Sequence, residues 1–122
     1  MAKTIKVLVL PTGKPAEVRE IASGLEAMQA VVGGYIEAVA INEHVTLWCN
    51  EEGKLTGLPL NLRAPSDPMF PHDIIAGDCF LTRIGSNGET KSLTEKDIKT
   101  FTEKFGLVGD TQKALRFLGI GG

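Results

Sequence analysis

The sequence has few cysteines, little net charge and no long apolar run. Two cysteines, Cys49 and Cys79, are too few for a disulfide framework, so we expect two reduced, buried thiols. Thirteen basic and 15 acidic residues give a net charge of −2, which argues against a general nucleic-acid binder because such proteins carry a basic excess. No apolar run reaches the roughly 18 residues of a membrane span, and no signal-peptide pattern is present. These absences predict a cytoplasmic protein.

Short runs of β-branched and aliphatic residues, separated by turn residues, predict the strands. The expected strands are at residues 5–10 and 16–21, which form a hairpin, and at residues 35–41 and 45–49, which flank a turn. Residues 73–77 and 79–84 are expected to form a bent strand pair with Gly77 as the irregular point. The Asn87-Gly88 pair predicts a hairpin in which residues 89–92 pair back.

Capping residues and apolar spacing predict three helices, at about residues 24–32, 93–105 and 111–118. Ser23 and Glu26 have the spacing of a capping box, and Gly33 stands where a left-handed C-cap is wanted. Ser92 and Thr94 are two possible N-caps of the second helix. The apolar faces are expected at Leu25, Met28 and Val32 in the first helix and at Ile98, Phe101 and Phe105 in the second.

The order of these elements predicts one α+β domain, residues 1–122, with a mainly antiparallel β-sheet. The length of 122 residues and the hydrophobic content of 43% suit a single core. Residues 106–122 form a C-terminal helical tail in this prediction. Four prolines interrupt residues 57–71, and loops of this length are often functional.

Three sequence blocks resemble a family of phage and plasmid proteins known only as a domain of unknown function. The blocks are VGGYIE at residues 32–37, CNEEGKL with GLPLN at 49–61, and DIIAG at 73–77, followed by Phe80. The resemblance covers about residues 4–105. It implies a mobile-element gene that acts in the cytosol of a bacterial host, and it implies no reaction.

The candidate ligand-binding residues are polar or aromatic side chains on or near the long loop: Asn61, Arg63, Lys54, Asn50, Tyr35, Trp48, His72 and Asp73. Asn61 and Arg63 follow a rigid Leu-Pro-Leu segment; an amide can contact a base or ribose edge, and an arginine fork suits a phosphate. Other interpretations stay open. Residues 50–54 also fit a solvated turn, Tyr35 and Trp48 also fit core or interface packing, and His72 also fits a surface position.

No catalytic set or metal-ligand spacing stands out, so we expect neither an enzyme nor a cofactor. The first hypothesis is a binding module that sequesters a small anionic ligand, such as a nucleotide signal of bacterial immunity, against the loop. The alternatives are a protein that inhibits a host enzyme and, third, an enzyme that cleaves such a nucleotide with His72. We also expect a homodimer or higher oligomer, with an apolar tail at residues 110–122 buried between subunits.

Overall fold

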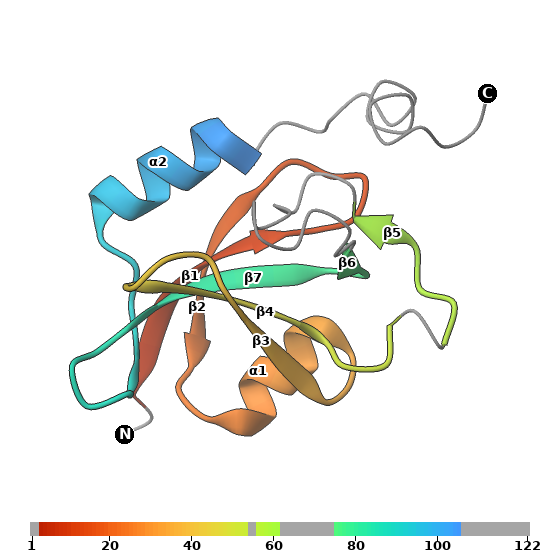
Figure 1. Cartoon of the computed structure of the whole chain (residues 1–122), viewed down its shortest axis with the longest axis horizontal. Coiled ribbons are helices and arrows are strands. Elements are labelled where there is room, and N and C mark those ends of the chain that lie inside the picture. Colours follow the sequence, from red (N-terminus) through yellow and green to blue (C-terminus); the bar gives the residue numbers. More distant parts are fainter. Residues whose placement is uncertain (1–2, 54–55, 62–74, 106–122) are drawn as a thin grey trace.

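The structure, a computed structural model, describes residues 3–53, 56–61 and 75–105 (Figure 1). Its strands are β1 (Thr4–Leu10), β2 (Glu17–Ala22), β3 (Ile36–Ala40), β4 (Val45–Asn50), β5 (Leu60–Asn61), β6 (Ile75–Ala76), β7 (Cys79–Ile84) and β8 (Thr90–Lys91). Its helices are α1 (Leu25–Val32) and α2 (Glu95–Phe105). The predicted α+β class with a mainly antiparallel sheet is confirmed. The expected helix at 111–118 and the tail at 106–122 lie outside the described residues.

The main sheet has the strand order β2-β1-β7-β4-β3, and every described pairing in it is antiparallel. The chain therefore places its first strand beside the seventh, far from it in sequence. β8 pairs with β7 at Arg83 and Ile84, which confirms the hairpin at Asn87-Gly88. Immediately after β8, the N–H of Leu93 donates to the carbonyl of Lys6 at 2.9 Å, so this segment lies beside β1.

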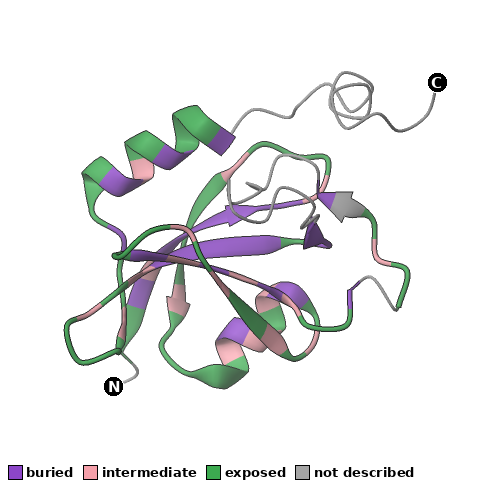
Figure 2. Ribbon diagram, in the orientation of Figure 1, coloured by how far each residue is buried: buried purple, intermediate pink, exposed green. Residues whose placement is uncertain are grey.

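The two faces of the sheet carry separate apolar cores because side chains alternate along each strand. On one face, α2 covers a core that consists of Leu8, Leu10, Val45, Leu47, Cys49, Ile75, Cys79, Leu81, Leu93, Phe101 and Phe105. On the other face, α1 covers Ile5, Val7, Val9 and Phe80 through Met28 and Val32. Figure 1 shows the two helices on opposite sides of the sheet. β1 thus supplies both cores, and it is the most completely buried of the longer strands along with β7 (Figure 2).

The second sheet is a small one in which β5 pairs with β6, Leu60 with Ala76 and Asn61 with Ile75. The expectation that residues 73–77 and 79–84 form one strand pair is therefore wrong. The chain turns between them at Gly77, whose φ of 87° favours glycine. The N–H of Gly77 donates to the carbonyl of Pro59 at 2.6 Å, which extends β6 toward β5 instead of β7.

The helix ends agree in part with the capping residues expected. Gly33 has φ 77° and forms the predicted left-handed C-cap of α1. The predicted capping box at Ser23 is wrong: the N-cap is Gly24 and no side chain caps the helix. The backbone N–H of Ser23 instead donates to Lys3 at 2.7 Å, so Ser23 belongs to the end of the β1–β2 hairpin. Leu25 is 58% exposed, so it does not share the buried face of Met28 and Val32.

Both cysteines are buried, as expected. In the second helix, Phe101 and Phe105 are buried and Ile98 is half-buried, as the spacing predicted. None of the helices in the described ranges is long and apolar enough to cross a membrane.

Candidate functional site

The structure describes four of the eight predicted ligand-binding residues, namely Tyr35, Trp48, Asn50 and Asn61. The other four, Lys54, Arg63, His72 and Asp73, lie outside the described residues, so their roles stay predictions. The four described residues do not form one cluster. Tyr35 and Asn50 meet at one corner of the main sheet, Trp48 lies within β4, and Asn61 lies in the small sheet.

Asn61 has a clear structural task. Its side chain is 3% exposed, and its Nδ2 donates to the carbonyl of Leu10 at 2.7 Å and to that of Gly77 at 3.2 Å. Leu10 ends β1, an interior strand of the main sheet, and Gly77 is the turn between β6 and β7. Asn61 therefore joins the small sheet to the main one, and this role explains why an amide follows the Leu-Pro-Leu segment.

Asn50 organises the corner where α1, β3 and β4 meet. Its Nδ2 donates to the carbonyl of Val32 at 3.2 Å, and its Oδ1 accepts from the N–H of Glu52 at 2.8 Å. Gly34 lies so close that a Cβ there would be 2.7 Å from the same Nδ2. The Gly33-Gly34 pair thus allows the chain to pass the Asn50 amide on its way into β3. Tyr35 follows, with 68% of its surface exposed.

The turn after Asn50 is a compact, internally bonded segment in its described part. The N–H groups of Gly53, Thr56 and Leu58 donate to the carbonyls of Asn50, Glu52 and Gly53, at 3.2, 2.9 and 2.9 Å. Gly53 is buried, and a Cβ there would lie 2.7 Å from the oxygen of Ala76. The turn is therefore held against β6, and it connects the main sheet to the small one.

Trp48 marks the part of the sheet that α1 leaves open. Its ring packs against the core under α1, and its Nε1 donates to Oγ1 of Thr82 at 2.8 Å. The register pairs Trp48 with Ala38 and Thr46 with Ala40, so these side chains share one face. We call the residues Ala38, Ala40, Thr46, Trp48 and Ile84 the open sheet surface. Each of them is exposed or half-buried, and Figure 2 shows β3 in green and pink, whereas β7 is largely purple.

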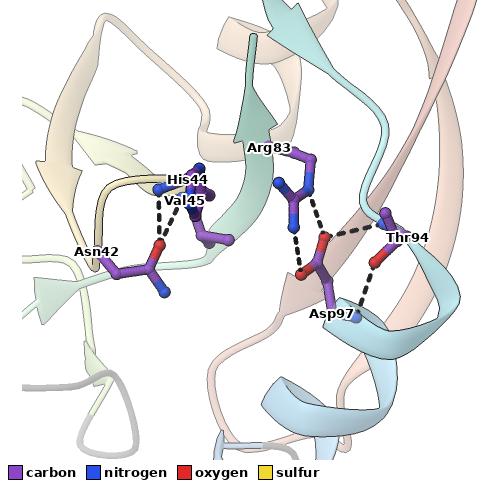
Figure 3. A network of polar contacts seen from close by, with 6 residues as sticks. All are labelled: Asn42, His44, Val45, Arg83, Thr94 and Asp97. Carbon is purple, nitrogen blue, oxygen red and sulfur yellow. Dashed lines mark hydrogen bonds and ion pairs between the residues drawn. The ribbon is translucent and has the colours of Figure 1, made fainter. Parts of the chain in front are cut away.

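A polar network ties the opposite face of the sheet to α2 (Figure 3). Arg83 donates through Nε and a terminal nitrogen to the two carboxylate oxygens of Asp97, at 2.9 and 3.1 Å. Asp97 also accepts from the N–H of Thr94 at 2.9 Å, and Oγ1 of Thr94 accepts from the N–H of Asp97 at 3.1 Å. Thr94 is thus the cap of α2, while Ser92 accepts from the N–H of Lys6 at 2.9 Å.

The charges of this network stabilise each other. Partial burial acts to raise the pKa of Asp97, but the hydrogen bonds from Arg83 and Thr94 outweigh it and lower that pKa. The same bond to Asp97 raises the pKa of Arg83. The bonds join α2 to β7 and are accounted for by the fold alone. The Arg83–Asp97 pair was not predicted from the sequence. The Thr94-x-x-Asp97 spacing is a capping signal, which indicates the contact of Asp97 with Thr94 but not its ion pair with Arg83.

The second histidine, His44, lies on the β3–β4 turn that Figure 3 also shows. Oδ1 of Asn42 accepts from the N–H groups of His44 and Val45 at 2.7 and 2.9 Å, which closes the turn. The part of the chain that the structure describes holds no group of three histidine, cysteine or carboxylate side chains placed to bind a metal ion.

Residues 3–53, 56–61 and 75–105 thus form a small α+β fold with one described helix on each face of an antiparallel sheet and an open sheet surface beside Trp48. The chain belongs to a family described as a domain of unknown function (DUF3846), which matches residues 5–106. Searches of curated proteins and of solved structures found no match.

Proposed function

We propose that this protein is a binding module that captures a small anionic ligand with a planar ring, as a nucleotide has, on the open sheet surface. The supporting observation is the half-buried ring of Trp48 beside the small side chains of Ala38 and Ala40. Stacking of a base on an aromatic side chain contributes about 1–3 kcal/mol and needs no hydrogen bond from the indole. Because Thr82 already accepts from Nε1, the ring orientation is set before a ligand arrives.

The anionic part of the ligand would be held by basic residues that follow this surface in sequence. Asn50 ends β4, two residues after Trp48, and Lys54 follows Asn50 by four residues. Arg63 comes two residues after the end of β5. Glu51 and Glu52 are exposed on the same turn and repel an anion, so Lys54 is needed to offset them. Asn50 and Asn61 use their amide nitrogens within the fold, and we therefore assign ligand contact to Trp48, Lys54 and Arg63.

The origin of the gene would determine which ligand the protein encounters in the cell. The resemblance of the sequence to phage and plasmid proteins supports a nucleotide messenger of bacterial immunity, which the protein would sequester in the cytosol of the host. Capture of a signal requires affinity and abundance, and it requires no reaction.

Fluorescence titration tests this proposal directly because Trp48 is the one tryptophan of the chain. We would titrate the protein with cyclic dinucleotides, cyclic mononucleotides and ADP-ribose derivatives, and repeat each positive titration by calorimetry. Stacking on the ring is expected to quench the emission with a saturable curve. No change in emission and no heat with any member of the panel would refute the proposal.

Two substitutions to glutamate provide the matched comparison. Thr46→Glu places a carboxylate on the open sheet surface and is expected to weaken binding by about tenfold or more, a change of about 1.4 kcal/mol. Val18→Glu adds the same charge to an exposed position of β2, on the opposite face of the sheet, and is expected to leave the affinity unchanged. Equal affinities for the two variants would place the ligand elsewhere.

A second candidate is an inhibitor that binds a host enzyme. Leu25 supports it, because this side chain is 58% exposed beside a shallow depression lined by Ala22, Ser23, Gly24, Glu26 and Ala27. Affinity purification from the bacterial host separates the two candidates. A stoichiometric protein that is lost with Leu25→Asp favours the inhibitor, whereas a small molecule released on heating favours the binding module. Chromatography of the released ligand also tests cleavage by His72: an intact ligand excludes it.

A further inference from the structure

The two outer strands of the main sheet differ in how they are protected. β2 carries Glu17, Arg19 and Glu20, and charged side chains on an edge strand discourage pairing with other chains. β3, with the sequence IEAVA, carries the single charged residue Glu37 and two exposed alanines. Among the described residues, no strand pairs with the outer side of β3. A weakly charged edge of this kind is a template for a further strand.

The backbone register shows which groups of β3 point outward. The N–H of Ile41 donates to Val45 at 3.0 Å and that of Glu51 to Tyr35 at 2.9 Å, so the odd-numbered residues from 35 to 41 face β4. Successive residues of an antiparallel strand alternate in this respect. The N–H and C=O groups of Ile36, Ala38 and Ala40 therefore point away from the sheet and are available to another strand.

We propose that β3 is the surface through which two copies of this chain pair, antiparallel about a two-fold axis at Ala38. In this register Ala38 lies opposite Ala38 of the second copy, and Ile36 lies opposite Ala40 of the second copy. The outward-facing N–H and C=O groups of Ile36, Ala38 and Ala40 then lie opposite outward-facing groups of the second copy and form hydrogen bonds with them. The contact is isologous, as in most closed dimers.

Other registers are less favourable on the same grounds. If the second copy were shifted by one residue, each of Ile36, Ala38 and Ala40 would lie opposite a residue whose N–H and C=O groups already face β4. The hydrogen bonds between the two copies would then be lost. A shift that moves the axis to Glu37 would keep two hydrogen-bonded pairs but place the two Glu37 carboxylates directly opposite each other, which is destabilising. A shift that moves the axis to Val39 also keeps only two such pairs within β3. The axis at Ala38 keeps three pairs.

The side chains agree with this axis on both faces of the sheet. On the α1 face, small alanines lie opposite Ile36 and opposite each other. On the α2 face, Glu37 lies opposite Val39 of the second copy, and Tyr35 lies opposite Ile41. Tyr35 is 68% exposed in the single chain and Ile41 is half-buried, so pairing covers the most exposed aromatic side chain of the described residues. The weakly charged β3 edges of both copies are then paired with each other, and the charged β2 strands become the outer edges of the joined sheet.

Cysteine cross-linking of the full chain tests the axis. In Ala38→Cys the two Cα atoms would lie about 5.5 Å apart, which a disulfide can span, so mild oxidation is expected to give a covalent dimer on a non-reducing gel. Ala40→Cys is the matched control, because its two Cα atoms would be about 13 Å apart or more and should not cross-link. Cys49 and Cys79 are buried and present in both variants. Absence of the Ala38→Cys cross-link, or equal cross-linking of both variants, overturns the proposal.

Light scattering provides a second measurement that needs no oxidation. The wild-type chain is expected to have about twice its 13.1 kDa mass at micromolar concentration. Ala38→Lys places two ammonium groups at the axis and should give the single-chain mass, with an unchanged far-ultraviolet circular dichroism spectrum as evidence that the fold is intact. Val18→Lys, on the β2 edge, should keep the dimer. A wild-type mass of one chain, or an Ala38→Lys variant that stays dimeric, contradicts pairing through β3, and the latter result points to another surface such as residues 106–122.

Discussion

The side-chain Nδ2 of Asn61 lies 2.7 Å from the backbone oxygen of Leu10, 51 positions earlier in the chain. This bond joins the small β5–β6 sheet to the end of β1, an interior strand of the main sheet. The same nitrogen donates to Gly77, so one buried amide holds three segments in place. A residue that the sequence presents as a ligand contact on a long loop is thus part of the interior of the fold.

Asn61→Ala is expected to destabilise the protein. The substitution leaves two carbonyl oxygens without this donor in a buried place, which costs about 1–3 kcal/mol in the free energy of unfolding. Urea unfolding followed by Trp48 emission measures the change. Thr56→Ala, at an exposed position of the same connection, serves as the control and should change the free energy by less. An Asn61→Ala variant as stable as the wild type would contradict the structural role.

Asp97→Asn is expected to lower the free energy of unfolding by about 1–3 kcal/mol at pH 7, because asparagine keeps the shape but loses the charged bonds to Arg83. The pKa of Asp97 is lowered in the fold, so its carboxylate stabilises the fold above the unfolded-state pKa of about 3.9. That contribution is lost as the pH falls through the folded-state pKa. The difference between wild type and variant should therefore be smaller at pH 2 than at pH 7.

Urea unfolding at a series of pH values provides this comparison. Glu95→Gln is a suitable control, since Glu95 lies in the same first turn of α2 but is exposed. Its difference from wild type is expected to be small at every pH. If the Asp97→Asn difference did not change with pH, the charge of Asp97 would not be the source of the stabilisation.

Thr82→Val is expected to release the indole of Trp48 from its hydrogen bond at nearly constant shape. The loss of the Nε1 partner should destabilise the fold by about 1 kcal/mol, and it should change the emission maximum of Trp48. Thr46→Val removes a hydroxyl from the same face of the sheet but leaves the Trp48 bond in place, so its spectrum should match the wild type. If ligand capture depends on a fixed ring, Thr82→Val should also weaken it.

Local patterns predicted most of the fold because the interactions that form it are local. The β1–β2 and β3–β4 hairpins, the turn at Asn87-Gly88 and the C-cap at Gly33 each depend on residues within a few positions of each other. The same holds for α2, where the cap at Thr94 and the apolar spacing of Phe101 and Phe105 agree. The sequence also predicted that both cysteines are buried.

The contacts that the sequence did not show are long-range. Nothing near residue 76 indicates that Ala76 pairs with Leu60 instead of continuing toward β7. Asn61 resembles a loop residue until its partners, Leu10 and Gly77, are known. Ser23 has the local spacing of a cap, but its backbone is already bonded to Lys3 across the hairpin. The candidate site depends on such contacts, so only Trp48 among the described predictions keeps a direct part in the proposed function.

The interior position of β1, between β2 and β7, has a consequence for synthesis on the ribosome. β1 can pair with β2 at once, but its other partner, β7, and the segment around Ser92 follow much later, 86 positions separating Lys6 from Ser92. At about 5–20 residues per second, roughly 4–17 seconds pass between the translation of these two residues. During that time the most apolar strand of the protein has no partner on its second edge. The nascent chain is therefore expected to depend on chaperones that bind its first hairpin until β7 emerges.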